Sequence, residues 1–175
     1  MVNERIALFA HLMRRAGFGA TRTELEEKAA SKYEEIVEDL LHPEHSPQVE
    51  DDLLERYYPG LLHIDAIPLA SAGWIYRMIN SRSPLKEKIA LFWHHVFATA
   101  WYKSEHPHSL SRQIETFRET GLSDLRTILM SLSKDPAMLH WLDNGENHTE
   151  EPNENYGREV LELFSMGVGN YTEQD

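Results

Sequence analysis

The segment LKEKIALFWHHVFATAWY, from Leu85 to Tyr102, is the most apolar helical pattern in the chain. Ser83 and Pro84 come directly before it. A serine followed by a proline is typical of a helix start, because the serine can cap the helix and proline suits its first position. The sequence therefore predicts an apolar helix over residues 84–101, and we expect this helix to lie at the centre of the fold.

Helix-type spacing of apolar residues recurs along the rest of the chain, and no run alternates apolar and polar residues between hairpin turns. The sequence predicts an all-α fold, an irregular bundle of about seven to nine helices around the central one. Besides residues 84–101, helices are expected over residues 5–15, 25–41, 49–57, 69–80, 107–120, 124–133, 136–141 and 153–166.

Capping residues mark several of these helix starts. A capping box formed by Thr21 or Thr23 with the glutamate three residues later opens the helix that runs through Leu41. Ser123 is expected to cap the helix over 124–133, and Asp135, which precedes a proline, is expected to open the next one.

Size, charge and composition restrict the class of protein. A chain of 175 residues with 41% hydrophobic residues can bury one substantial core, so we expect a single helical domain over residues 1–175. The formal charge of -12 would repel a phosphate backbone, which makes nucleic acid a poor partner. The chain has no cysteine, which excludes disulfides, thiolate metal sites and a cysteine nucleophile.

The N-terminal stretch MVNERIALFAHLMRRAGFGA lacks the long uncharged segment of a signal peptide, because Glu4, Arg5 and His11 interrupt it. No window is apolar over the length that a membrane span requires. We therefore expect a cytoplasmic protein without a membrane span.

The closing stretch PNENYGREVLELFSMGVGNYTEQD, from Pro152 to Asp175, predicts an amphipathic helix followed by a turn. At helical spacing, one face carries the apolar residues Tyr156, Val160, Leu163 and Phe164, and the opposite face carries Asn155, Arg158, Glu159 and Glu162. Thr172, followed by acidic residues, is typical of the cap of a further helix. We therefore expect the chain to be the N-terminal part of a longer domain.

The polar face has three interpretations. It is solvated, with Arg158 pairing with Glu154 and Glu162 at four-residue spacing. It is a site, in which His94, Arg158, Glu159 and Glu162 are the candidate catalytic residues, and in which His94, Glu159 and Glu162 are the candidate ligands of a divalent metal. Or it is structural: Asn153, Asn155 and Arg158 clamp neighbouring loops and hold the turn GVGNYT after the helix, in which Gly167 and Gly169 supply the positive φ.

Other histidines and motifs give weaker signals. His94 and His95 are about 100° apart around a helix, so at most one of them is a straightforward ligand of a given metal. His106 and His108 flank a proline and could bind metal adventitiously. The chain contains no HExxH, GxSxG, phosphate-binding or dinucleotide-binding motif, so the common enzyme classes lack their usual signatures.

Four segments of the chain together resemble a known family. They are HLMRRAGFGAT at 11–21, LFWHHVFAT at 91–99, DPAMLHWLDN at 135–144 and the closing stretch. Their order and length are similar to those of the bacterial family known as domain of unknown function 1800. In one departure, members read FWHNHF where this chain has His95 and Val96, which weakens a metal site that needs a second histidine there.

The resemblance implies a helical architecture, no established reaction, export in many members, and a neighbouring gene that encodes a sulfatase-like partner of unknown function. The family's polar positions correspond here to Arg14, Arg15, His94, Asn144, Asn153, Glu154, Asn155, Arg158, Glu159, Glu162, Thr172 and Asp175. We therefore expect a helical binding or scaffolding module that acts with a separately encoded protein. The alternative is a metal-assisted or acid–base hydrolase whose site is completed by residues after 175.

Overall fold

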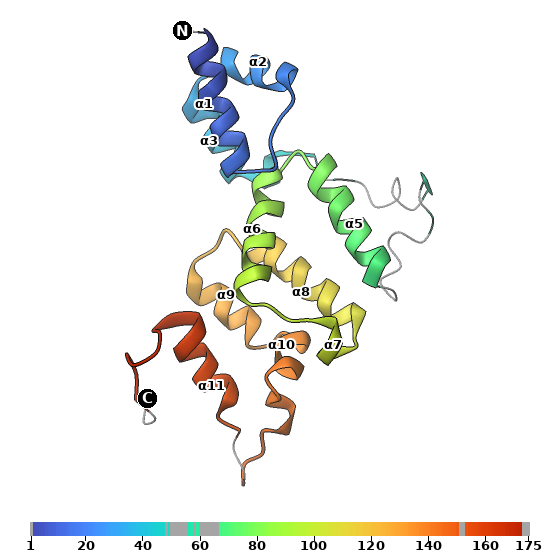
Figure 1. The fold of residues 1–175 in the computed structure, drawn as a ribbon, viewed down its shortest axis with the longest axis vertical. Helices are drawn as coiled ribbons and strands as arrows, with labels where there is room; N and C mark the ends of the chain where they lie inside the picture. The colour runs from blue at the N-terminus through green and yellow to red at the C-terminus, as the bar shows by residue number, and fades with distance from the viewer. Residues whose placement is uncertain are drawn as a thin grey trace. The chain divides into compact units, whose positions relative to one another are not determined.

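The computed structural model describes residues 2–47, 49, 56–57, 59, 67–150 and 153–172. These residues contain ten α-helices and no strand, which confirms the all-α prediction (Figure 1). None of the helices in these ranges is long and apolar enough to cross a membrane. The helix predicted over 49–57 and the acidic residues after Thr172 lie largely or wholly outside the described residues.

The chain divides into two compact units, residues 1–91 and 92–175, and the boundary falls inside one helix, α6. The expectation of a single domain therefore stays a prediction. The first unit contains α1 (Val2–Arg15), α2 (Arg22–Ala30), α3 (Tyr33–Leu41), the 3₁₀ turn η1 (Pro43–His45), α5 (Ile67–Asn80) and the first part of α6 (Pro84–Val96).

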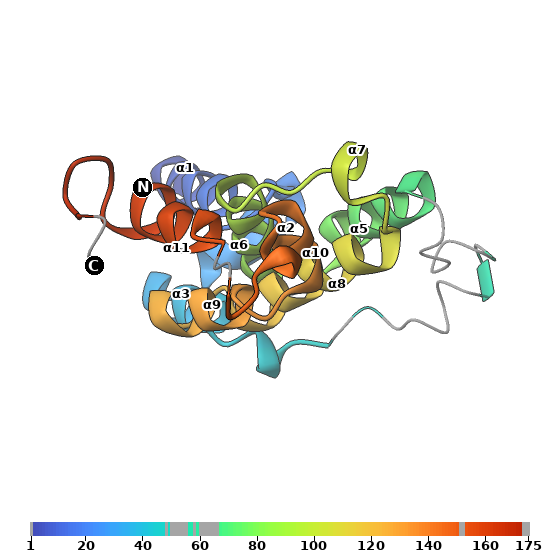
Figure 2. The ribbon, with the colours of Figure 1, turned by 90° about the horizontal axis from the view of Figure 1, so that it is seen from below.

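In the first unit, α1 packs against α2, and the rings of Phe9 and Tyr33 join it to α3 (Figures 1 and 2). The capping box that opens α2 is the one formed by Thr21 with Glu24. The single helix predicted through residue 41 is wrong, because the chain is extended at Ser31 and Lys32 and forms two helices. The Arg5 guanidinium donates to the Ser31 carbonyl (2.7 Å), which helps to hold this break.

The predicted apolar helix forms as α6, which starts at Pro84 as expected but ends at Val96 rather than at residue 101. Ala90 on α6 is completely buried. Glu87 is also completely buried, and its carboxylate accepts a hydrogen bond from the Trp74 indole of α5 (3.2 Å). Ser83 precedes the helix, and its hydroxyl donates to the carbonyl of Pro43 (3.2 Å).

The second unit begins with the end of α6, and its described residues continue through five α-helices, one 3₁₀ turn and one π-helix. They are α7 (Trp101–Ser104), α8 (Pro107–Thr120), α9 (Leu125–Leu132), α10 (Pro136–Trp141), the 3₁₀ turn η2 (Asn144–Glu146), and α11 (Asn155–Glu159), which continues as the π-helix η3 (Val160–Ser165). Helix α8 packs against α9 and α10 (Figures 1 and 2). Asp124 rather than Ser123 caps α9, since its carboxylate accepts from the Thr127 amide (2.9 Å).

The core of the second unit combines apolar packing with one buried polar chain. Its apolar residues are Phe97, Leu110, Phe117, Ile128, Leu132, Ala137, Met138 and Leu142. The Thr99 hydroxyl donates to Gln113 (2.7 Å), and the Gln113 amide donates to Asp135 (2.7 Å). Asp135 also caps α10, as the sequence predicted. This polar chain joins α8 to the start of α10.

The closing helix differs from the predicted amphipathic α-helix because its second half is a π-helix over Val160–Ser165. In a π-helix the backbone hydrogen bonds join residues five apart. Side chains therefore point in other directions around the helix axis than a spacing of 3.6 residues per turn predicts. Leu163, predicted on the apolar face, is 66% exposed, whereas Glu162, predicted on the polar face, is half-buried. The predicted segregation of an apolar and a polar face therefore does not hold in the second half of the helix.

Candidate functional site

A cleft of about 970 Å³ lies in the second unit, around the segment that joins α10 to the closing helix. Asn144, Asn147, Asn153 and Asn155 are in its lining, and we call it the amide cleft after them. Asn144 and Asn147 follow α10, whereas Asn153 and Asn155 lie at the start of the closing helix. Ser133 at the end of α9, together with Tyr171 and Thr172 after the closing helix, completes the polar lining.

Two of the asparagines clamp the end of α10. The side-chain amides of Asn155 and Asn153 donate to the carbonyls of Leu142 (3.0 Å) and Asp143 (2.9 Å). These carbonyls follow the last turn of the helix, where no intrahelical donor is left for them. The clamp predicted for Asn153 and Asn155 is therefore present, although it holds the end of α10 rather than the turn after residue 166.

The clamp includes a residue in an unusual conformation. Asp143 has a φ of 56°, a value that residues other than glycine rarely adopt. Its carbonyl is held by Asn153, and its carboxylate accepts from the Lys103 ammonium (2.9 Å). Strained backbone of this kind persists only where its surroundings fix it. These contacts therefore fix the conformation of the chain at Asp143, directly before the cleft residue Asn144.

Arg158 projects at the edge of the cleft. Its guanidinium donates to Asn155 (2.7 Å) and lies 3.8 Å from Glu159. The predicted pairs of Arg158 with Glu154 and Glu162 are not formed. The Arg158 side chain is 57% exposed, so the guanidinium keeps donors that face solvent and can meet an acceptor on another molecule.

The turn after the closing helix leads to Tyr171 and Thr172, which also line the cleft. Gly167 and Gly169 have φ values of 85° and 81°, so the predicted use of glycine in this turn is confirmed. The turn brings Tyr171 back to the helix, where its hydroxyl donates to the Glu162 carboxylate (3.3 Å). Glu162 thus positions a residue that lines the cleft.

The structure does not bring the candidate catalytic residues together in one site. Of the four, only Arg158 lines the amide cleft, whereas His94, Glu159 and Glu162 do not. Within the described part of the chain, His94, Glu159 and Glu162 do not form a group with converging ligand atoms. Arg14 and Arg15 are exposed at the end of α1, in the other unit, and Thr172 lines the cleft.

Sequence reasoning missed several residues of the cleft. Tyr156 was placed on an apolar face, yet its hydroxyl shares a 2.6 Å hydrogen bond with Ser133, and both residues line the cleft. Asn147 is not among the predicted site residues, yet its side-chain oxygen accepts from the backbone N–H of Asn153 (3.2 Å). The only sequence signal for Asn147 was its place among the polar residues before the closing helix. Nothing in the sequence around Ser133 indicated that it would line a cleft.

His94 supports a prediction on pH and stability. Burial lowers the pKa of His94 from its ordinary value of about 6.5. The unfolded chain therefore binds a proton there more readily than the folded chain, and stability is lost as the pH falls from about 6.5 toward the folded pKa. In thermal unfolding at pH 7 and pH 5, we expect His94→Gln to lose less stability on acidification than the wild type.

The neighbouring histidine is the control for this measurement. His95 is exposed on the same helix, so His95→Gln should follow the wild-type dependence on pH. If His94→Gln and His95→Gln respond alike, His94 does not contribute to the acid sensitivity of the fold.

Comparisons with known proteins identify the family. No curated protein and no solved structure gave a match to this chain. Residues 11–175 match the family described as "Protein of unknown function (DUF1800)". Because the match covers nearly all of the chain, including both the clamp and the cleft, the chain belongs to this family.

Proposed function

We propose that the chain is a helical binding module that holds an extended segment of a separately encoded protein in the amide cleft. The observation that carries the proposal is the lining of this cleft, in which four asparagines and one arginine surround a volume of about 970 Å³. Cavities of a few hundred to about 1,000 Å³ are typical of ligand sites.

Amide side chains suit a polypeptide ligand. Each asparagine has a carbonyl acceptor and two N–H donors, which are the groups that a peptide backbone needs. Asn153 and Asn155 are already fixed by their bonds to the end of α10, so little side-chain entropy is lost when a ligand binds. The exposed guanidinium of Arg158 adds a site for a carboxylate of the partner.

Exposed apolar side chains near the cleft favour a protein over a small polar ligand. Leu163, Met166 and Val168 are 66%, 47% and 76% exposed and belong to the helix and turn that form one side of the cleft. Neighbouring exposed apolar side chains are characteristic of protein contact surfaces. A small polar ligand would leave them uncovered, whereas a polypeptide could contact both them and the asparagines.

The hydrolase alternative has weaker support. An acid–base or metal mechanism needs carboxylates or histidines that face the substrate. Glu159 and Glu162 are in contact with Arg158 and Tyr171, respectively, and neither lines the cleft. The proposed binding role depends instead on the asparagines and Arg158, which do line the amide cleft.

The proposal predicts a defined loss of affinity when the cleft is altered. The purified chain is titrated by calorimetry with the protein encoded by the neighbouring gene, and a saturable one-to-one complex is expected. Arg158→Ala and Asn144→Ala should each weaken binding at least about tenfold, since arginines and fixed polar groups in a cleft are frequent hot spots.

Arg126→Ala is the matched control, because Arg126 is an exposed arginine of the same unit that lies outside the amide cleft. It should bind the partner with wild-type affinity. Circular dichroism melting of each variant separates lost binding from lost folding. The absence of a complex with the wild type, or equal affinities for Arg158→Ala and Arg126→Ala, would refute the proposal.

A further inference from the structure

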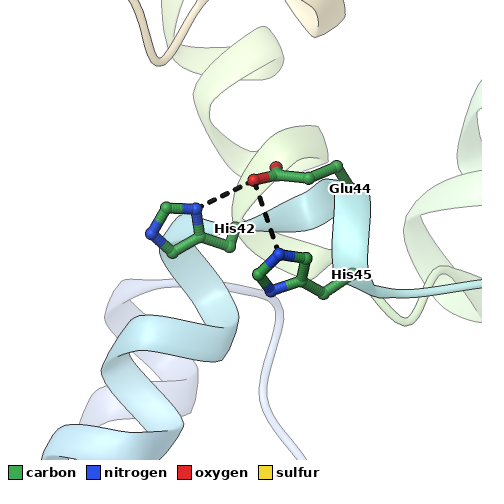
Figure 3. Close-up of side chains that lie close together, drawn as sticks. All are labelled: His42, Glu44 and His45. Atoms are coloured by element: carbon green, nitrogen blue, oxygen red, sulfur yellow. Dashed lines mark hydrogen bonds and ion pairs between the residues drawn. The ribbon is translucent and has the colours of Figure 1, made fainter.

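We propose that His42, Glu44 and His45 form a binding site for one divalent transition-metal ion of the zinc class. Within the described residues, these three are the group of histidine and acidic side chains whose ligand atoms converge, all lying within 4.8 Å of one another. Figure 3 shows the Glu44 carboxylate between the two imidazoles, with a ring nitrogen of each histidine facing one of its oxygens. All three side chains are exposed, so an ion can reach them from solvent.

The distances are close to those that a metal requires. A glutamate oxygen lies 2.8 Å from Nδ1 of His42 and 4.0 Å from Nε2 of His45. Ligand atoms about 2.0–2.2 Å from a tetrahedral zinc ion stand about 3.3 Å apart. The three ligand atoms lie within 4.8 Å of one another, and rotation of these exposed side chains can bring them to that spacing.

The two rings lie close together, and a further carboxylate lies beside one of them. The imidazoles of His42 and His45 have centroids 5.3 Å apart and planes 19° apart. On the other side of the His42 ring, the Glu38 carboxylate lies 3.6 Å from Nε2. A carboxylate that orients the non-ligating nitrogen is the usual outer partner of a metal-bound histidine.

The backbone holds the three residues in a short rigid turn. Pro43 fixes one φ angle, and the His45 and Ser46 amides donate to the carbonyls of His42 (3.0 Å) and Pro43 (3.2 Å). The buried hydroxyl of Ser83 also donates to the Pro43 carbonyl and ties the turn to the start of α6. Because the ligands lie within four residues, binding closes no long loop and costs little chain entropy.

The donor set indicates the class of ion. Two imidazole nitrogens and one carboxylate suit zinc and similar first-row metals, whereas magnesium and calcium prefer oxygen ligands. Three protein ligands leave one position of a tetrahedral ion open to water or to a group from another molecule. The site lies in the unit that does not contain the amide cleft, and it does not depend on the proposed function.

The test is a titration of chelator-treated protein, free of any histidine tag, with Zn²⁺ by calorimetry and with Co²⁺ by visible absorption. One ion per chain and the absorption of a tetrahedral cobalt site are expected. His42→Gln, Glu44→Gln and His45→Gln should each weaken Zn²⁺ binding by more than about tenfold, and Glu38→Gln by about tenfold. Mg²⁺ should not compete.

Two variants control for adventitious binding. His11→Gln alters an exposed histidine of α1, and His106→Gln alters the pair formed with His140, whose rings lie 6.4 Å apart. Both should bind Zn²⁺ as the wild type does, and all variants should melt at the wild-type temperature. Absence of saturable binding, or a loss in the control variants equal to that in His42→Gln, would overturn the proposal.

Discussion

Phe97→Ala is expected to destabilise the fold by about 3–5 kcal/mol and to lower the melting temperature by about 6–20 °C. The Phe97 ring is completely buried and contacts three other rings. It stacks on Trp93 at 5.2 Å and on Phe117 at 5.9 Å, and it meets Phe164 edge to face at 5.0 Å. Truncation to alanine removes all three contacts and leaves a cavity, which explains the large cost.

The same substitution is expected to affect the amide cleft. Phe164 belongs to the π-helix whose first residues line the cleft, and its ring is held by Phe97. Phe97→Ala should therefore increase hydrogen exchange of amides in Val160–Ser165 as well as lower global stability. Thermal unfolding followed by circular dichroism measures global stability, and native-state hydrogen exchange measures the local opening of Val160–Ser165.

Phe92→Ala is the control, because Phe92 lies on α6, is 51% exposed and packs edge to face against the ring of Trp93. It should cost less than about 1 kcal/mol. If both variants lose the same free energy of unfolding, the ring contacts of Phe97 contribute little to the stability of the second unit.

Local sequence signals predicted helix ends well where the capping side chain and its partner are close in the chain. Thr21 with Glu24 and Asp135 before α10 both cap as expected, because each bond spans three residues. The break at Ser31 and Lys32 was missed. One of the bonds that hold it comes from Arg5, twenty-six residues away, and spacing within a helix carries no information on such a contact.

The candidate site was predicted in part for the same reason. Asn153 and Asn155 were assigned a clamping role from their residue type, but the carbonyls of Leu142 and Asp143 that they bind depend on how α10 and α11 pack. The π-helix could not be predicted, because helical periodicity presumes 3.6 residues per turn. The convergence of the His42, Glu44 and His45 side chains could not be predicted either, since it depends on the conformation of the turn after α3.

Gln113→Leu is expected to cost about 2–4 kcal/mol at pH 7, although leucine fits the volume and removes a polar group from the core. Gln113 is completely buried and bridges Thr99 and Asp135, which are 7% and 4% exposed. Without the amide, the Thr99 hydroxyl loses its acceptor and the Asp135 carboxylate loses a donor. Each buried group left unsatisfied costs about 1–3 kcal/mol.

A double-mutant cycle checks that the cost arises in this chain of bonds. Thr99→Val removes the hydroxyl that donates a hydrogen bond to Gln113. In that background, Gln113→Leu should therefore cost about 0.5–3 kcal/mol less than in the wild type. Urea unfolding at pH 7 measures each corner of the cycle. Strictly additive losses would mean that Thr99 and Gln113 act independently.

The loss of stability caused by Gln113→Leu should also depend on pH, because it depends on whether the Asp135 carboxyl group is ionised. Burial raises the pKa of Asp135 above its ordinary value of 3.8, while the bonds from Met138 and Gln113 and the charge of Arg112 lower it. Stability from a raised pKa is full below the unfolded value and is lost as the pH rises through the folded one. Removing the Gln113 donor raises the Asp135 pKa further, so the variant loses more stability than the wild type as its carboxylate ionises. Unfolding in urea at about pH 4 and at pH 7 should therefore show a smaller difference between variant and wild type at the lower pH, whereas an equal difference at both would show that Gln113 does not stabilise the Asp135 charge.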